Sequence, residues 1–306
     1  MNNSDNLSSF EAYITARKAM IDEALARYLP GEKNYPAIIF KAMRYSLFAG
    51  GKRIRPILCL AALEALGAKE ETERSALPLA CALEIIHTYS LIHDDLPAMD
   101  NDDCRRGMPS SHKAFGEDIA ILAGDALLTE AFSLMSNREL MEAIPLERVL
   151  AVIHEIARAA GCFGMIGGQV VDVQSEGQAV DEETLYFMHT RKTGALIVAS
   201  LKTGALLAGA GEKELNALAG YGLSIGLMFQ IVDDILNVEG DKYATGKSTG
   251  SDASRGKATF PSLFGLEGSR RKVRDLKEQA WAALADFDSR AEPLRMLAKH
   301  IMERRS

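Results

Sequence analysis

The chain has 306 residues, of which 47% are hydrophobic, and a formal net charge of −7 at pH 7. This allows one large domain or two ordinary ones, and the negative charge argues against a nucleic-acid-binding surface. The four cysteines lack metal-ligand spacing, the first residues lack the features of a secretory signal, and no run of about 18 apolar residues is free of charged or polar breaks. An intracellular, cytoplasmic protein without a membrane span is therefore predicted.

The chain is rich in Ala, Leu, Met, Glu and Lys, and the alternating pattern of β-strands is almost absent, which favours α-helices. Apolar residues recur at helical spacing from 36 to 49, and Gly50 and Gly51 can end that helix because glycine tolerates positive φ. Similar segments follow at 76–95, 117–135, 146–165, 181–210, 212–239 and 271–287. No change of composition marks a boundary, so a single all-α domain covering 1–306 is predicted. The stretch 241–261 is the one long non-periodic segment, and loops of that length are often functional.

The stretch SLIHDDLPAMDNDDCRRG (90–107) collects five aspartates and two arginines after an apolar, helical run. Pro97 disfavours helical backbone in the residue before it, so the helix is expected to end there and Asp100 can turn back toward Asp94. Carboxylates at a helix C-terminus oppose its dipole unless a cation is present, and Mg²⁺ suits clustered carboxylates completed by water and phosphate. A calcium EF-hand is excluded because a loop starting at Asp100 places Arg105 at the required glycine. A solvated charged loop is the alternative.

A second acidic segment, AGYGLSIGLMFQIVDDILNVEG (219–240), is apolar almost all round and is expected to be a buried helix. Its charges, Asp233 and Asp234, require a counter-charge if they are buried. Gly222 and Gly226 lower helix propensity by about 1 kcal/mol each, which indicates close approach by another helix or room for a ligand. Two helices that end in paired aspartates suggest two metal-binding walls facing one cavity. An internal salt bridge is the alternative for the second pair.

Basic residues are distributed over several separate segments of this acidic chain. They occur in GGKRIRP (50–56), in RKTGAL (191–196) and, as Lys247 and Lys257, in the long loop. Capping of a helix C-terminus is the simpler interpretation of GGKRIRP. Cations beside metal sites, however, are typical of diphosphate binding. The sequence contains neither a GxxxxGK[ST] motif nor a GxGxxG motif after a predicted strand. A nucleotide-binding site is therefore not indicated.

The motifs GGKRIRP, IIHTYSLIHDDLPAMDNDDCRRG, GGQVVDV, RKTGAL and FQIVDDILNV, with the loop behind the last, stand in order between about 36 and 261. Together they resemble the trans-isoprenyl diphosphate synthases, most closely the bacterial farnesyl diphosphate synthases (geranyltranstransferases). The resemblance implies an all-α isoprenoid synthase fold, a helical bundle around a deep central cavity, and a homodimer. It also implies a Mg²⁺-dependent prenyltransferase of isoprenoid biosynthesis. Such an enzyme condenses isopentenyl diphosphate with dimethylallyl and geranyl diphosphate to give farnesyl diphosphate (C15).

Carried over to the matching positions, the resemblance also implies roles for single residues. Three Mg²⁺ would be ligated by Asp94, Asp100 and Asp233. The allylic diphosphate would be contacted by Arg105, Lys192 and Lys247. Isopentenyl diphosphate would be held by Lys52, Arg55, His87 and Arg106. The catalytic group would be Lys192, Thr193 and Gln230, with the last two near the reacting carbons. Gln169 and Asp172 of GGQVVDV share a helical face and are expected to support these residues.

The sequence also contains a residue, Tyr89, that can influence the chain length of the product. Tyr89 lies five residues before Asp94, about 7.5 Å back along a helix, though not straight beneath the metal site. In the family, an aromatic residue at this position together with a two-residue insertion in the first motif accompanies a C15 product. The insertion is present as LPAM between Asp95 and Asp100. A core aromatic without a role in specificity is the alternative for Tyr89.

The second motif departs from the family. It is usually DDxxD and here reads DDILN, so Asn237 predicts weaker binding of the third metal. Three other functions remain open: a geranylgeranyl diphosphate synthase with a deeper pocket, a terpene cyclase, and a non-catalytic partner subunit. A cyclase would leave the cations assigned to isopentenyl diphosphate without a substrate, and only Asn237 favours a partner subunit. Asp102 and Asp103 have no assigned role, and Asp125 is interpreted as a satisfied buried acid.

Overall fold

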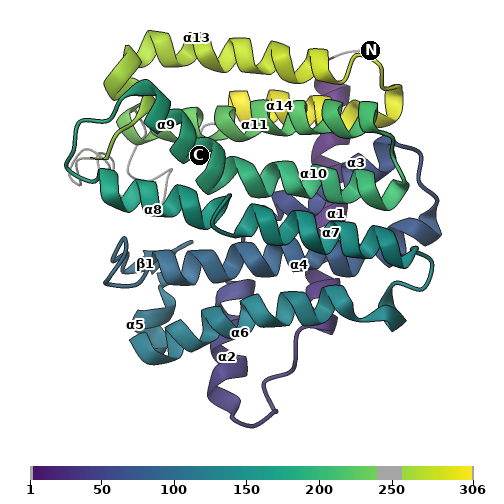
Figure 1. Cartoon of the computed structure of the whole chain (residues 1–306), viewed down its shortest axis with the longest axis vertical. Helices are drawn as coiled ribbons and strands as arrows, with labels where there is room; N and C mark the ends of the chain where they lie inside the picture. Colours follow the sequence, from purple (N-terminus) through teal and green to yellow (C-terminus); the bar gives the residue numbers. More distant parts are fainter. Residues whose placement is uncertain (1–2, 240–256, 305–306) are drawn as a thin grey trace. The chain divides into compact units, whose positions relative to one another are not determined.

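The computed structural model describes residues 3–239 and 257–304. The chain divides into two compact units, one of Met1–Leu60 and Lys69–Ile153, the other of Ala61–Ala68 and His154–Ser306. Both units are built of helices, and in the described ranges only two two-residue strands occur (Figure 1). The all-α class is therefore confirmed, whereas the single domain stays a prediction.

The first unit holds the helices around the first aspartate motif. Its elements are α1 (Asn3–Tyr28), α2 (Ala37–Phe48), the start of α3 (Ile54–Ala65), α4 (Glu70–Asp94), β1 (Cys104–Arg105), β2 (Met108–Pro109), α5 (Ser111–Phe115), α6 (Glu117–Ser136), the 3-10 turn η1 (Arg138–Leu140) and the start of α7 (Leu146–Ala160). In this unit α4 and α6 run side by side (Figure 1). The strands pair antiparallel, with Arg105 opposite Met108.

The second unit holds the remaining motifs. Beyond the ends of α3 and α7, it contains α8 (Met165–Ser175), α9 (Glu182–His189), the π-helical turn η2 (Thr190–Gly194), α10 (Ala195–Ala208), α11 (Glu212–Glu239), α13 (Phe260–Ala283), the 3-10 turn η3 (Ser289–Ala291) and α14 (Glu292–Glu303). Helices α11 and α13 pack along each other (Figure 1). The phenolic oxygen of Tyr221 donates a 2.6 Å hydrogen bond to the carbonyl of Leu294, which ties α11 to α14.

Most predicted helices are confirmed, and their ends follow local chemistry. Helices α2, α6 and α11 have nearly the expected bounds, whereas α4 begins six residues earlier than predicted, at Glu70. Acidic residues in the first turn of α4 suit the positive end of its dipole. Helix α13 begins at Phe260, before the predicted 271, because Thr259 and Ser262 form a capping box. The predicted 146–165 helix ends at Ala160, and 181–210 is interrupted by η2.

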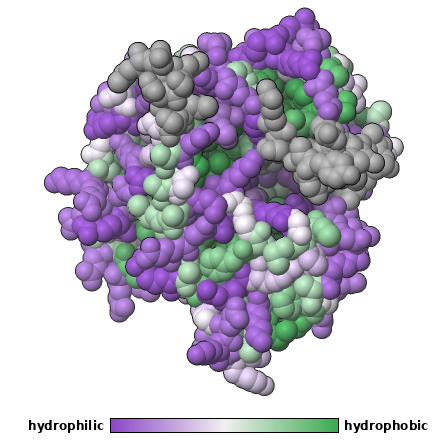
Figure 2. Space-filling view, turned by 180° about the vertical axis from the view of Figure 1, so that it is seen from behind, coloured by the Kyte–Doolittle hydropathy of each residue, from purple (hydrophilic) through white to green (hydrophobic). Residues whose placement is uncertain are grey.

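Four helical segments, 70–94, 117–136, 146–175 and 212–239, are long and apolar enough to cross a membrane by length and composition. The sequence prediction rests on the charged and polar residues that interrupt these apolar stretches, and length and composition alone do not overturn it. Burial gives α4 another reason to be apolar, since 72% of its window lies inside the protein. The absence of a membrane span stays a prediction. On the face seen in Figure 2, apolar residues form patches between polar ones.

Candidate active site

The first aspartate motif is a helix end followed by a tight turn. Helix α4 ends at Asp94, and the backbone N–H of Asp100 donates to the carbonyl of Asp94 at 2.9 Å. Asn101, with φ of +52°, continues the turn by donating to the carbonyl of Leu96 at 3.1 Å. The prediction that Asp100 turns back toward Asp94 is therefore confirmed, and both residues are partly exposed.

The second aspartate of this motif has a different environment. Asp95 is only 2% exposed, and Nε of Arg105 lies 3.0 and 3.1 Å from its two carboxylate oxygens. Nη2 of Arg105 contacts the same carboxylate and lies 3.6 Å from Asp102. Burial raises the pKa of Asp95 above its ordinary value, and Arg105 opposes this only in part. The aspartate that Arg105 contacts is thus one that the sequence did not single out.

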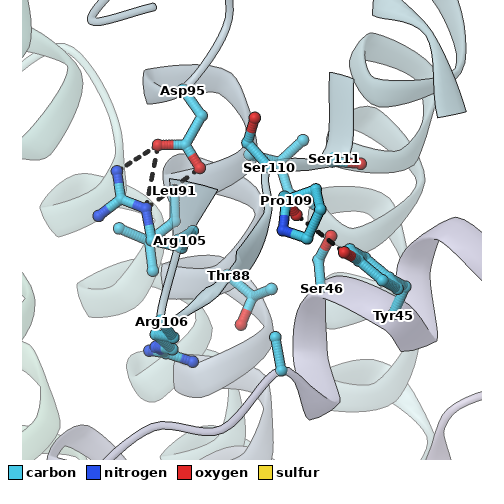
Figure 3. A pocket seen from close by; sticks show the side chains of 12 residues that line it. Tyr45, Ser46, Thr88, Leu91, Asp95, Arg105, Arg106, Pro109, Ser110 and Ser111 are labelled. Carbon is cyan, nitrogen blue, oxygen red and sulfur yellow. Dashed lines mark hydrogen bonds and ion pairs between the residues drawn. The ribbon is translucent and has the colours of Figure 1, made fainter. Parts of the chain in front are cut away.

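Arg106 lies next to Arg105, but in Figure 3 its guanidinium is well apart from the pair that Arg105 forms with Asp95. Its φ is +54°, and Nη1 donates to the carbonyl of Gly50. A Cβ on Gly51 would lie 2.6 Å from that Nη1, and Gly51 has φ of +128°, so only glycine fits there. The two glycines therefore do more than end a helix, because they also accommodate Arg106.

Cations gather around His87, one of the residues assigned to isopentenyl diphosphate. Burial, with added repulsion from Arg106, lowers the pKa of Arg55 to about 10, although Glu84 opposes this. Burial and the neighbouring arginines, Arg55 first, lower the pKa of His87 well below its ordinary value. Nε of Arg55 is buried and has no hydrogen-bond partner among the described residues. This group of like charges is electrostatically suited to an anion.

Arg53, in the same GGKRIRP segment, has a structural role that the sequence did not reveal. It is 2% exposed and has φ of +52°. Its guanidinium lies 2.7 Å from Asp22 and 3.0 Å from Glu84, and it donates to the carbonyl of Leu47 at 2.8 Å. Arg53 thereby fixes the loop that carries exposed Lys52 and leads into the first turn of α3, where the partly exposed Arg55 lies.

In the second unit, Asp172 on α8 holds two lysines. Its Oδ2 lies 2.5 Å from Nζ of Lys192 and 3.9 Å from Nζ of Lys257. A Cβ on Gly168 would lie 2.2 Å from the backbone nitrogen of Lys192, so α8 approaches η2 closely. The supporting role expected of Asp172 agrees with these contacts. Gln169 lies on α8 and is partly buried.

Thr193 and Gln230 are brought together by the π-helical turn. The Thr193 hydroxyl donates to Oε1 of Gln230 at 2.5 Å. A Cβ on Gly226 would lie 3.0 Å from Cα of Gly194, so α11 packs directly on η2. Gly222 similarly faces Val198 of α10. The glycines of α11 therefore serve close helix approach, as predicted, and π-helical turns are frequent at functional sites.

The second aspartate pair, like the first, has one accessible and one buried member. Asp233 is 46% exposed and forms an ion pair with Arg304, whose guanidinium lies 4.1 Å from the ring centre of Phe229. Burial lowers the pKa of Arg304 to about 10. The counter-charge that the sequence requires for this helix is therefore present. Asn237 is partly buried one turn further along α11.

Asp234 is buried and acts within the fold. It is 6% exposed, and Oδ2 accepts a 2.9 Å hydrogen bond from the backbone N–H of Phe260, at the start of α13. Nε2 of His189 lies 3.8 Å from the same oxygen, and its ring stacks on Phe260. Asp234 thus ties α11 to the first turn of α13.

Tyr89 is 6% exposed and packs at right angles to His93, with ring centres 5.7 Å apart. Nε2 of His93 lies 3.0 Å from the carbonyl of Ile121, and a Cβ on Gly124 would lie 2.1 Å from that nitrogen. The Asp125 side chain is 61% exposed and 3.9 Å from His93. The interpretation of Asp125 as a buried acid is therefore wrong, because it lies on the outer side of α6.

Asp102 and Asp103, which have no assigned role, differ in their surroundings. Asp103 is exposed and lies 2.8 Å from Lys113, while the Asp102 side chain is 13% exposed beside Arg105. Asp103 thus fits a solvated loop better than Asp102 does. Lys247 lies outside the described residues.

The carboxylates of the first aspartate motif are candidate ligands of a metal ion. Within 3–239 and 257–304, no three His, Cys, Asp or Glu side chains form a preformed metal cluster. Asp94 and Asp100 nevertheless provide oxygen ligands at the negative end of a helix dipole. This donor set fits Mg²⁺, which takes one or two carboxylates and completes its shell with water and substrate phosphate.

Residues 36–291 match the polyprenyl synthetase family. The chain belongs to this family. It is 47% identical over 293 residues to a geranylgeranyl diphosphate synthase of Cyanophora paradoxa, with 95% of each chain covered. It is 46% identical over 280 residues to a farnesyl diphosphate synthase of Geobacillus stearothermophilus, covering 92% of this chain and 93% of the relative.

A solved structure of an FPP/GFPP synthase from Zymomonas mobilis matches with a TM-score of 0.85 at 37% identity, covering 96% of this chain and 99% of the other. The chain is therefore a prenyltransferase with the isoprenoid synthase fold. These relatives differ in the product that their names state, so they do not decide chain length.

Proposed function

We propose that this polyprenyl synthetase condenses isopentenyl diphosphate with dimethylallyl and geranyl diphosphate, with Mg²⁺, to give farnesyl diphosphate. The observation that carries the proposal is the group of cations around His87. Nε of Arg55 is buried without a hydrogen-bond partner among the described residues, and burial lowers the pKa of this guanidinium to about 10. The oxygens of a bound diphosphate would accept hydrogen bonds from such a group and balance its charge. Lys52, Arg55, His87 and Arg106 would hold isopentenyl diphosphate.

The proposed reaction begins with cleavage of the allylic C1–O bond, and the diphosphate leaves with the electron pair. Arg105, Lys192 and Lys247 would stabilise the charge that develops on it. The double bond between C3 and C4 of isopentenyl diphosphate then attacks C1. The departing diphosphate takes the proton from C2, so no protein nucleophile is required. Oxygen dipoles of Thr193 and Gln230 would stabilise the allylic cation.

Asp94 and Asp100 in the first unit and Asp233 in the second would be the protein ligands of Mg²⁺, and we propose three ions with substrate bound. Bound Mg²⁺ would neutralise the allylic diphosphate and make it a better leaving group. For Asp233, the ion pair with Arg304 would have to be exchanged for the metal.

The C15 product is supported by Tyr89 and by the LPAM spacer of the first motif. A buried ring one and a half turns before Asp94 can limit the space for an elongating tail. A geranylgeranyl diphosphate synthase is the second candidate, because a relative with that name is as similar as one named for the C15 product.

The test is a product assay with purified protein. Isopentenyl diphosphate and Mg²⁺ are combined with dimethylallyl, geranyl or farnesyl diphosphate, and chain lengths are measured. We expect C15 from the first two and no extension of the third. Extension of farnesyl diphosphate would favour the second candidate, and no turnover with any primer would favour a partner subunit.

We also propose a cytoplasmic homodimer. Helices α2 and α6 carry exposed apolar side chains at Ile38, Ile121 and Leu122, which are 44%, 44% and 54% exposed. A second copy is the occupant that the family resemblance favours for such a face. Light scattering during size exclusion should give twice the 33.2 kDa chain mass, and Leu122→Glu should reduce it. A wild-type monomer would contradict the proposal.

A further inference from the structure

Asp94 and Asp95 are adjacent in sequence but differ in accessibility. Asp94 is partly exposed, whereas Asp95 is 2% exposed. A Mg²⁺ ion that keeps several of its waters needs an accessible carboxylate. Both oxygens of Asp95 are already used, because Nε of Arg105 lies 3.0 and 3.1 Å from them.

The position of Asp95 is rigid. Its backbone N–H donates to the carbonyl of Leu91 at 3.1 Å, so the residue continues the hydrogen bonding of α4. The backbone position of its carboxylate is therefore fixed by a long buried helix. A side chain that binds to the Asp95 carboxylate is held in a fixed position relative to that helix.

Arg105 is held from its backbone side as well. It lies in the β1–β2 ribbon, and the Tyr45 hydroxyl donates to the carbonyl of Pro109 at 2.8 Å. The N–H of Ser110 donates to the carbonyl of Asp103 at 2.9 Å, which closes the ribbon. With backbone and side chain both fixed, the guanidinium has one orientation, which Figure 3 shows.

One edge of the Arg105 guanidinium is not used in the ion pair with Asp95. Nε and Nη2 are directed to Asp95, whereas Nη1 makes no hydrogen bond with any described residue. The Arg105 side chain is 21% exposed, so it is reachable from solvent. The ion pair thus uses one edge of the guanidinium and presents the other to an anion.

We infer that Asp95 is a positioning residue for the allylic diphosphate, acting through Arg105, and is not a ligand of Mg²⁺. The inference rests on the proposed function, in which Arg105 contacts that diphosphate. In this arrangement the two adjacent aspartates have separate tasks: Asp94 binds metal and Asp95 orients the cation that binds the same substrate.

The test compares Asp95→Asn with Asp94→Asn in the full-length protein. For Asp95→Asn we expect KM for the allylic diphosphate to rise about tenfold, since a hydrogen bond to a charged group is worth about that factor. KM for isopentenyl diphosphate and the Mg²⁺ concentration for half-maximal rate should stay within about twofold. Asp94→Asn should instead raise the Mg²⁺ requirement.

Two further measurements separate positioning from a general structural effect. In an Arg105→Ala background, Asp95→Asn should have no additional effect on allylic KM, because the two residues act as one unit. Calorimetry with inorganic diphosphate without Mg²⁺ should show weaker binding for Asp95→Asn and not for Asp94→Asn. If Asp95→Asn does not fold, Asp95→Glu, which keeps the charge but displaces Arg105, should show the same selective rise of allylic KM.

Three outcomes would overturn the inference: a raised Mg²⁺ requirement in Asp95→Asn, equal effects on both substrates, or additivity with Arg105→Ala. Failure of the proposed function looks different, because then the wild-type protein itself would not join the two diphosphates. A C20 product would leave the inference unaffected.

Discussion

The hydroxyl of Thr193 donates a 2.5 Å hydrogen bond to Oε1 of Gln230, joining the π-helical turn to α11. Because the hydroxyl proton points to Gln230, the oxygen lone pairs of Thr193 are free to face a cation. Neither residue titrates near neutral pH, so both can act as fixed dipoles during the reaction.

Thr193→Val should therefore lower kcat by about tenfold or more with little change in either KM, since the lost interaction forms with the developing cation. Thr190→Val is the matched control, because the Thr190 hydroxyl of the same turn donates to backbone carbonyls, that of Tyr186 at 2.6 Å and that of Phe187 at 3.2 Å. Steady-state kinetics of both variants checks this. Equal losses of kcat would indicate a disturbed turn and no specific role for Thr193.

Tyr89→Ala should lengthen the product beyond C15. Removing the buried ring leaves a space beside His93 into which an elongating tail can extend. Tyr89→Phe keeps the ring and should keep C15. Product chain length by chromatography decides the matter, and unchanged C15 from Tyr89→Ala would show that another group limits the chain.

The fold and the local geometry of the motifs could be predicted because they depend on short-range patterns. Helical periodicity located α2, α6 and α11, and the turn after Asp94 followed from Pro97. The supporting ion pairs could not be predicted in this way. Asp22 with Arg53 and Asp233 with Arg304 are 31 and 71 positions apart in the sequence. Only tertiary folding brings such charges together.

The adjacent pairs show the same limit. Asp94 and Asp95, or Asp233 and Asp234, are identical in sequence terms, yet one member of each pair is accessible and the other buried. A helix rotates by 100° per residue, so neighbours face different surroundings. Which neighbour faces a cation or an N–H group depends on the packing partner, as with Phe260 and Asp234.

His189 should make stability depend on pH. Burial lowers its pKa to about 4, with Lys192 lowering it further and Asp172 opposing. The unfolded chain, with a histidine pKa of about 6.5, binds this proton more readily than the folded protein. Stability should therefore fall as pH drops from about 6.5 to 4, by at most about 3 kcal/mol.

The measurement is urea unfolding between pH 7.5 and 4.5 for wild-type protein and His189→Gln. The variant should lose less stability on acidification. His154→Gln, at an exposed position of α7, is the control and should follow the wild type. Parallel pH profiles for wild type and His189→Gln would contradict the assignment.

Asn237→Asp should lower the Mg²⁺ concentration that gives half-maximal activity. Asn237 lies four residues after Asp233 on α11, so a carboxylate there adds a charged oxygen on nearly the same helix face. Mg²⁺ binds carboxylates more strongly than neutral amide oxygens, because the attraction between full charges is larger. Asn237→Ala, which removes the oxygen, should shift the requirement in the opposite direction. Mg²⁺ titrations of the rate, and of inorganic diphosphate binding by calorimetry, measure both. An unchanged requirement in Asn237→Asp would mean that this position does not reach the metal.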